Sequence, residues 1–399
     1  MDMTVTQIGA VVVAELHAAG YMESTIGQYA KTIKALSEFA SGRAYSVELG
    51  ADFASMTTSV RTGRFSAQRR FDYRRLVGVF DSYVCTGQVD LSVRGRGGGG
   101  RQPMARGFVE LDAAWEVEME RRGLAAATRA AYGRVARSYL VFLEGCGIVE
   151  LGDADGASVL VFLESLLGKW AKSSLFWLVS NFRPFLNFTG RSDLVDALNL
   201  AGVKRSHAII PVLGDADEGL VVEACASGAV SARDAAITLL ALTTGLRACD
   251  IVGMRTGDID WRSRTIGIVQ QKTGNPLTLP LPALVMAKLA DYVLGERPCS
   301  GDDHLFLRSV APHTRLNDHA SVHRVTVTTF QKAGVAKAKA GTRRLRHNAA
   351  SRLLSAAVPL PTISAVLGHA SAESTNLYMS VDRERLLECV LPVPECVRS

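Results

Sequence analysis

A glycine- and arginine-rich segment divides this chain of 399 residues into parts. Residues 94–106 contain four arginines, no acidic residue and an unbroken run of four glycines. Because the segment has too few apolar side chains to bury a core, it predicts a flexible linker between separately folded domains. Its arginines are Arg94, Arg96, Arg101 and Arg106. They make the segment a candidate for lying along a phosphate backbone, with an ordinary soluble linker as the alternative.

A sequence repeat straddles this linker. Four residue types recur 103 positions later, as Gly20 and Gly123, Thr25 and Thr128, Tyr29 and Tyr132, and Phe39 and Phe142. Apolar side chains around both sets recur at helical spacing. We therefore expect a duplicated helical domain, at residues 1–93 and 107–195, with two unrelated amphipathic helices as the alternative.

The pattern changes beyond a second connector, residues 196–214. Ser231 is typical of the start of a helix that ends at Gly245. Two strand candidates, Thr265–Val269 and Leu277–Leu281, flank a turn and so predict an antiparallel hairpin. The later segments again show helical periodicity. The predicted fold is therefore mainly α with a small antiparallel β-sheet in the third domain, residues 215–382, followed by a tail at 383–399.

Composition excludes several classes of protein. The chain is 48% hydrophobic and 21% charged, which argues against disorder, and its net charge of +6 is compatible with nucleic acid. The seven cysteines form no C-x-x-C pair, so neither a disulfide framework nor a zinc site is predicted, and a cytoplasmic protein is expected. No apolar run is long enough for a membrane span. We find no phosphate-binding loop or metal motif, and therefore expect no cofactor and no metal.

Basic residues gather in two clusters. The first cluster has six arginines against one acid: Arg61, Arg64, Arg69, Arg70, Arg74 and Arg75. The second, residues 336–352, has six lysines and arginines and no acid, and it places Arg343, Arg346 and His347 on one helix face. Such runs are usually solvated faces. Two features of the second cluster favour anion binding instead. Its helix has a clear apolar side, and the N-terminus of that helix, with its positive dipole, lies at the basic residues.

Three motifs in the third domain resemble those of the tyrosine recombinases, the family of phage integrases and Xer proteins. The first covers Thr244–Met254 and contains Arg247 and Asp250. The second is Arg343–Leu354, with Arg344, Arg346 and His347. The third is Leu367–Tyr378, in which His369 and Tyr378 are nine residues apart. Lys272 lies between the first two motifs, in the hairpin turn, as in the family.

The resemblance implies a catalytic set for breaking and rejoining DNA without metal or ATP. Tyr378 would attack the phosphodiester and form a covalent 3′-phosphotyrosine. Arg247 and Arg346 would clamp the phosphate, and His369 would donate to a non-bridging oxygen. Lys272 would protonate the leaving 5′ oxygen. Asp250 and His347 are expected to support this set, Asp250 by orienting Arg247 or its helix.

Arg343 departs from the family pattern, which has histidine or lysine at this position. Arginine can donate hydrogen bonds to a phosphate, but it is effectively never deprotonated. A proton-accepting role for this position is therefore not expected. Because of Arg343, a catalytically silent DNA-binding protein is an alternative function, and a type IB topoisomerase-like activity is another.

The resemblance also implies the partners. The expected assembly is a homotetramer on two double-stranded DNA recombination sites, with accessory DNA-binding proteins as optional partners. Residues 383–399 would dock on a neighbouring subunit or pack on their own domain. Residues 1–93 would bind DNA through Arg69, Arg70, Arg74 and Arg75, or else serve dimerisation or solubility. The residues do not distinguish integration, excision, transposition and dimer resolution.

Overall fold

The computed structural model describes residues 3–58, 62–91, 101–167, 170, 172–202, 212–317, 319–336 and 340–368. These residues form three parts, each around a hydrophobic cluster of its own. The described residues are mainly helical, and their one sheet has three antiparallel strands. This confirms the fold class predicted from the sequence. No helix among the described residues is long and apolar enough to cross a membrane.

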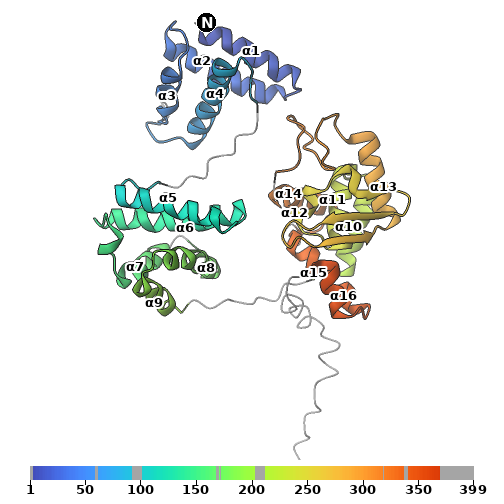
Figure 1. Cartoon of the computed structure of the whole chain (residues 1–399). Helices are drawn as coiled ribbons and strands as arrows, with labels where there is room; N and C mark the ends of the chain where they lie inside the picture. Colours follow the sequence, from blue (N-terminus) through green and yellow to red (C-terminus); the bar gives the residue numbers. More distant parts are fainter. Residues whose placement is uncertain are drawn as a thin grey trace, which may run out of the picture. The chain divides into compact units, whose positions relative to one another are not determined.

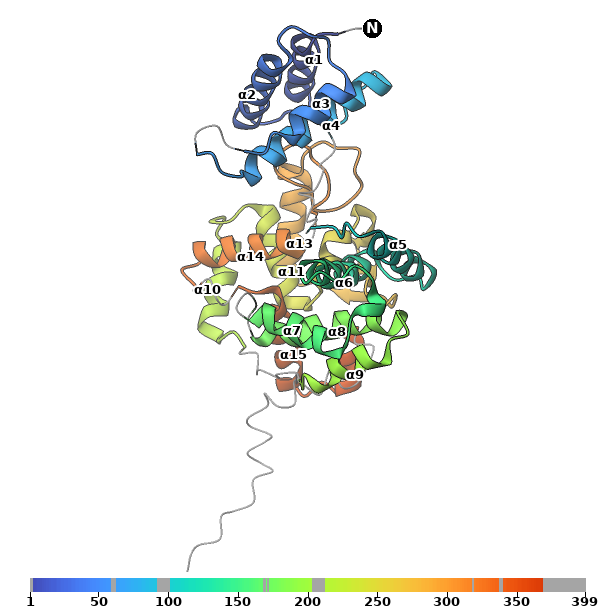
Figure 2. The same ribbon diagram turned by 90° about the vertical axis from the view of Figure 1, so that its left-hand side faces the viewer.

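The N-terminal part is a bundle of four helices. They are α1 (Val5–Ala18), α2 (Glu23–Ala40), α3 (Val47–Ser55) and α4 (Ala67–Thr86). α1 and α2 lie side by side, and α3 packs on α4 (Figures 1 and 2). Ile8, Leu36 and Phe80 have no exposed surface, and the rings of Phe53 and Tyr73 stack with centroids 4.0 Å apart. This aromatic and aliphatic core is what joins the four helices.

The middle part is a second helical bundle. Its elements are α5 (Arg106–Arg121), α6 (Ala126–Gly145), the 3₁₀ turn η1 (Leu151–Asp153), α7 (Gly156–Leu167), α8 (Lys172–Phe188) and α9 (Ser192–Leu200). Trp115, Tyr139 and Phe182 are fully buried in its core. Pro184 lies inside α8, which continues to Phe188. α9 extends past residue 195, the predicted domain boundary, because Leu194 and Leu198 are buried in the same core. Arg106, placed in the linker by the sequence, begins α5.

The structure carries the 103-residue offset through the turns of both bundles. α2 begins at Glu23 and α6 at Ala126, a difference of 103. Each is preceded by a glycine with positive φ, Gly20 at 72° and Gly123 at 66°. The amide after each glycine closes the same turn, from Tyr21 to the Leu16 carbonyl and from Leu124 to the Met119 carbonyl. Both turns are Schellman-type helix ends, which favour glycine because of its left-handed backbone.

The same offset recurs at the end of the last long helix of each bundle. α4 ends at Thr86 and α8 at Phe188, and the Thr-Gly steps Thr86–Gly87 and Thr189–Gly190 follow with φ of 71° and 72° at the two glycines. The other helices begin at different offsets: α1 and α5 begin 101 residues apart, α3 and α7 begin 109 apart, and α4 and α8 begin 105 apart. The two bundles therefore share the 103-residue offset at the turns before α2 and α6 and at the glycines after α4 and α8, while the other helix starts differ and the middle bundle has the additional helix α9.

The C-terminal part is a helical domain with a small sheet on one side. Its helices are α10 (Asp215–Ala226), α11 (Ala232–Thr244), α12 (Ala248–Gly253), α13 (Ala283–Asp291), α14 (His319–Lys332), α15 (Thr342–Ser355) and α16 (Leu360–Leu367). The strands are β1 (Ile259–Asp260), β2 (Thr265–Val269) and β3 (Pro276–Pro280), with short turns η2 (Thr256–Asp258) and η3 (Tyr292–Glu296). β2 is central, and its Ile266 faces Leu279 of β3 with both side chains buried.

α11 is the centre of this domain. The Ser231 side chain caps its first turn, as the sequence predicts, and the helix ends at Gly245. α11 packs on α13, α14 and α15, so nearly every side of it is buried. Its run of alanine and leucine suits this position because small apolar side chains allow helices to approach on several faces. The turn after α11 is therefore fixed against the surrounding helices.

Candidate active site and nucleic-acid interface

The turn after α11 brings the first motif against the last two described helices. Gly245 has φ of 64°, and a Cβ atom there would lie 2.9 Å from Leu367 Cδ2 and 3.0 Å from Ala349 Cβ. Only glycine satisfies both the backbone conformation and this close packing. The turn therefore lies directly on α15 and α16, and Arg247 follows it two residues later, at the N-cap of α12.

Arg247 is partly buried and has two hydrogen-bond partners. Its Nη2 donates to the Gly368 carbonyl at 2.9 Å, and its Nη1 donates to Gln270 Oε1 at 3.3 Å. Gly368 is the left-handed residue that caps α16. The C-terminal carbonyls of a helix carry partial negative charge, so they suit a guanidinium. Arg247 thus links α12 to the end of α16 and to the β2–β3 hairpin.

Arg346 reaches the same place from α15. Its side chain is buried, with 9% of the residue surface exposed. Nη1 donates to the Gly245 carbonyl at 2.9 Å, and Nη2 donates to the Leu367 carbonyl. A buried arginine needs such partners because an unpaired buried charge is costly. The structure therefore brings together Arg247 and Arg346, which are 99 positions apart in the sequence.

Gln270 connects these arginines to the hairpin. Its residue surface is 1% exposed, and its Nε2 lies 3.4 Å from the Leu367 carbonyl. Its Oε1 accepts from Arg247 and, at 2.8 Å, from Thr273 Oγ1. Its backbone also closes the hairpin turn by accepting from Gly274 N at 2.8 Å. The sequence analysis missed Gln270, because its importance arises from contacts with residues almost 100 positions away.

Lys272 stands exposed on the turn that Gln270 anchors. The turn is also held by Asp250, whose Oδ1 accepts from the Gln271 amide at 2.9 Å. Asp250 was expected to orient Arg247 or its helix. Among the contacts between described residues, its carboxylate instead binds the hairpin, and its other oxygen, Oδ2, is buried without a hydrogen-bond partner. Asp250 therefore positions the turn that carries Lys272.

The remaining members of the second motif differ in exposure. Arg343 is exposed on the first turn of α15, Arg344 is partly exposed, and His347 is buried with 8% of its surface accessible. Burial, and after it the charges of Arg343 and Arg346, lower the pKa of His347 to about 4. His347 is therefore neutral at neutral pH.

Two of the predicted catalytic residues, His369 and Tyr378, lie outside the described residues. The described chain ends at Gly368, one position before His369. Their roles stay predictions. Residues 383–399, the predicted docking tail, also lie outside the described part of the chain.

Within the described ranges, one group of side chains has the spacing of a metal site. The ligand atoms of Asp302, Asp303 and His304 lie within 4.8 Å of one another. Asp302 accepts from the His304 ring at 2.6 Å and from the Arg315 amide at 2.9 Å, and Asp303 pairs with Arg255. These contacts close the loop before α14, so the group has a structural explanation.

The predicted DNA-binding arginines lie in different surroundings. On α4, Arg74 is exposed, whereas Arg75 lies over the Tyr29 ring at 4.3 Å and Arg69 donates to the Thr58 carbonyl at 2.9 Å. Arg70 lies over the Phe65 ring at 5.2 Å. Arg106 pairs with Glu110 on α5. Of the remaining arginines of the basic cluster and the linker, Arg64 is exposed. The others lie outside the described residues: Arg61, Arg94 and Arg96.

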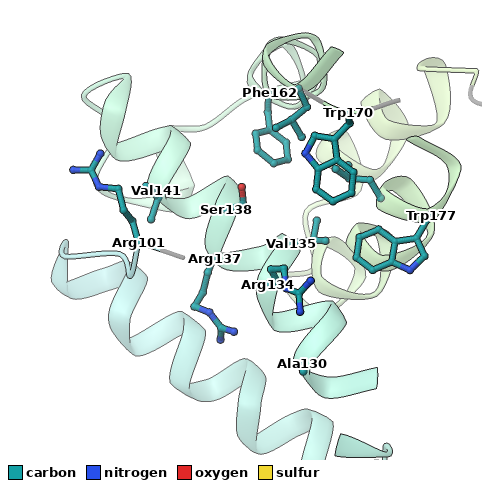
Figure 3. Close-up of a pocket in the computed structure, with 12 residues that line it drawn as sticks. Arg101, Ala130, Arg134, Val135, Arg137, Ser138, Val141, Phe162, Trp170 and Trp177 are labelled. Carbon is teal, nitrogen blue, oxygen red and sulfur yellow. The ribbon is translucent and has the colours of Figure 1, made fainter. Parts of the chain in front are cut away.

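Arg101 lines a cavity of about 600 Å³ in the middle bundle. Figure 3 shows Arg134 and Arg137 of α6 on one side of this cavity, with the indoles of Trp170 and Trp177 on the other. The two indole rings are nearly parallel, with centroids 5.8 Å apart. Cations beside aromatic rings are typical of nucleic-acid surfaces, although Arg137 also lies 3.5 Å from Asp112. The sequence analysis missed this group, whose visible signal was two arginines three positions apart on one helix.

Comparison with known proteins places the catalytic motifs in one family. Residues 215–385 match the phage integrase family. The tyrosine recombinase XerC of Mesorhizobium japonicum is 30% identical over 282 residues, which cover 67% of this chain and 89% of that protein.

Solved structures share the fold. A crystal structure of the XerH site-specific recombinase bound to a palindromic difH substrate, in a post-cleavage complex, has a TM-score of 0.57 at 15% identity. The matched region covers 86% of this chain and 92% of the XerH chain. A lambda integrase dimer bound to a COC′ core site has a TM-score of 0.53 at 16% identity, covering 82% of this chain and 92% of that chain.

Proposed function

The chain belongs to the tyrosine recombinases of the phage integrase family and is a site-specific DNA recombinase; from this premise we propose that it acts through a covalent link between Tyr378 and DNA. The observation that carries this mechanism is the convergence of Arg247 and Arg346 on the carbonyls of Gly368 and Leu367. Two guanidiniums fixed beside the start of the third motif provide the positive site that a scissile phosphate needs.

The proposed reaction exchanges one phosphate ester for another. The oxygen of Tyr378 attacks the phosphorus, the bond to the 5′ oxygen breaks, and Lys272 gives that oxygen a proton. Tyrosine has an ordinary pKa of about 10, so ionisation of Tyr378 requires the positive potential of the arginines. Because the phosphotyrosine conserves the ester bond, rejoining needs neither ATP nor metal.

The position of Lys272 supports its role as the acid. Its side chain is exposed at the tip of the β2–β3 turn, while Gln270 and Asp250 fix the base of that turn. An exposed lysine on such a hairpin can reach bound DNA, and because the base of the hairpin is anchored, the backbone that carries the lysine stays in one position. His369 would donate to a non-bridging oxygen, and Arg343 would donate to the phosphate from the first turn of α15.

We assign DNA contact to the middle bundle as well. Its cavity carries Arg101, Arg134 and Arg137 beside two indole rings. Charge would attract the phosphate backbone, and the rings give the surface an apolar side for bases or sugars. The complete assembly would be four subunits on two duplex sites, with residues 383–399 joining neighbouring subunits.

The test is a suicide substrate, a nicked duplex taken from DNA that flanks the gene. After cleavage, the short fragment that carries the free 5′ hydroxyl diffuses away, so the strand cannot be rejoined. Wild-type protein should therefore remain attached to the DNA, and the attached product should migrate more slowly on a denaturing gel. The Tyr378→Phe variant should bind the same duplex with wild-type affinity and leave no attached product, because only the attacking oxygen is removed. A covalent product from this variant would overturn the assignment.

The rival functions give different outcomes in the same assay. A silent DNA-binding protein would bind the duplex and never become attached to it. A topoisomerase-like enzyme would become attached and would relax supercoiled DNA, but would not join strands of two different duplexes. Exchange of strands between two labelled duplexes is the result expected of this chain.

A further inference from the structure

We propose that the N-terminal bundle binds duplex DNA through one face, made by α2 and α4 and carrying Lys31, Lys34 and Arg74; below we call it the α2–α4 face. The inference rests on the proposed function in one respect, since it assumes that DNA is the partner of the middle bundle. It goes further by assigning a second DNA surface on the same chain and by naming the side chains that form it.

The structural repeat supplies the first argument. Arg134 and Arg137 line the cavity of the middle bundle from α6. The positions 103 residues earlier are Lys31 and Lys34 of α2. Both lysines are exposed. Two cations three positions apart therefore recur on the equivalent helix of the first copy, and they point to the same side because i and i+3 share a helix face.

The helix opposite, α4, carries a further cation at a corresponding position. Trp177 of α8 lines the cavity, and the residue 103 positions earlier is Arg74 of α4, which is exposed. Trp170 corresponds in the same way to Ala67. The first bundle therefore has neither indole at the positions that correspond to the cavity, and it has a cation at one of them. A surface with cations in place of aromatic rings suits phosphates, and phosphate contact does not depend on base sequence.

The charges between α2 and α4 are also arranged so that a carboxylate faces inward. Asp72 lies between the two helices and is 5% exposed, and its carboxylate accepts from Gln28 of α2 at 3.0 Å and from Gln68. The Asp72 carboxylate is therefore turned inward, whereas Lys31, Lys34 and Arg74 are exposed. Glu38, also exposed, lies one turn beyond Lys34 on the same side of α2 and is the one carboxylate on that side next to the lysines.

These contacts also revise which arginines meet DNA. Arg69 and Arg75 were predicted from the charge run to bind phosphates. Arg75 covers the Tyr29 ring of α2, and Arg69 binds the carbonyl of Thr58, so both hold the bundle together. We therefore assign phosphate contact to Arg74, which belongs to the charge run, and to Lys31 and Lys34 of α2, which do not.

The test measures how the DNA affinity of the full chain depends on salt. The probe is a mixed-sequence duplex of about 40 base pairs, long enough for two binding surfaces on one protein. Each lost phosphate contact lowers the slope of log affinity against log salt by about 0.9. The combined variant Lys31→Gln, Lys34→Gln and Arg74→Gln should lower the slope by about 2 to 3, and restoring each position with the other basic residue should recover it.

The matched control is Arg43→Gln. Arg43 is an exposed cation of the same bundle, but it follows the end of α2 and donates to the Ala40 and Phe39 carbonyls. The Arg43→Gln substitution removes one charge and leaves the α2–α4 face unchanged. The slope of log affinity against log salt for this variant should therefore stay within about 0.3 of the wild-type slope. An unchanged slope in the combined variant, with folded helix content by circular dichroism, would overturn the inference.

The failure of the two proposals can be told apart. If wild-type protein becomes covalently attached to DNA but the combined variant keeps its salt slope, only the α2–α4 face is wrong. If the combined variant loses slope but wild-type protein never becomes attached, the face is right and the covalent mechanism is wrong.

Discussion

Arg247 and Arg346 donate hydrogen bonds to the carbonyl oxygens of consecutive residues at the end of α16. The Arg247 bond goes to Gly368, and the Arg346 bond goes to Leu367. The spacing between the two guanidiniums is therefore set by one peptide unit of the helix end. Because His369 follows directly in the sequence, a movement of α16 would shift both arginines and the start of the third motif together.

Gln270→Ala should slow covalent attachment to DNA by about 10- to 100-fold without changing DNA affinity. The variant loses the acceptor that holds Arg247 and Thr273, so Arg247 gains freedom next to the phosphate. The measurement is the single-turnover rate on the nicked substrate together with the equilibrium affinity. Gln271→Ala is the control, since that exposed side chain lies on the same turn. A parallel loss of affinity and rate would mean that Gln270 only maintains the fold.

Lys272→Ala should slow cleavage strongly on a normal substrate and weakly on one with a 5′ thiol leaving group. A thiol leaves without needing a proton, so an acid is no longer required. The comparison uses cleavage rates of both substrates with the same variant. Equal losses on the two substrates would show that Lys272 binds DNA and does not donate the proton.

Part of the arrangement of the first motif could be predicted because its residues keep local spacing. Gly245 and Arg247 lie two residues apart, so the turn and the side chain can be inferred together. The role of Gln270 could not be inferred in this way, since its partner carbonyl at Leu367 is 97 positions away. Asp250 was predicted to orient Arg247 or its helix, and among the described residues its carboxylate also accepts from the amide of Gln271. Only the fold decides which of two nearby groups a carboxylate reaches.

The limits of pattern reading are also visible in the N-terminal bundle. The offset of 103 residues was visible in the sequence, and the fold extends it to Gly87 and Gly190. A run of arginines, however, does not show which side chains face solvent. Arg75 lies on an aromatic ring of a neighbouring helix, while Lys31, outside the run, is exposed.

Arg343→His should retain activity, whereas Arg343→Ala should lose about 10²- to 10³-fold in cleavage rate. Both arginine and histidine can donate to the phosphate, and alanine cannot. Arg343 is exposed at the first turn of α15, so neither change should unfold the domain. The readout is the single-turnover rate of covalent attachment. Full activity of the alanine variant would remove Arg343 from the catalytic set.

Acid should destabilise the wild-type protein more than a His347→Gln variant. The folded-state pKa of His347 is about 4, below its ordinary value of 6.5, chiefly because the side chain is buried. Between these two values the unfolded chain binds a proton that the folded chain does not. The stability from neutral His347 is therefore complete above pH 6.5 and is lost as pH falls towards 4.

The measurement is the free energy of unfolding in urea at pH 7.5 and pH 5.5, for both proteins. Wild type should lose more stability over this interval than the variant, because other titrating groups are common to both and cancel in the difference. The same interval should leave the imidazole of His347 unprotonated in the folded protein, which its NMR chemical shifts report directly. Equal losses, or a His347 that titrates near pH 6.5, would mean that α15 does not shield this side chain as the structure indicates.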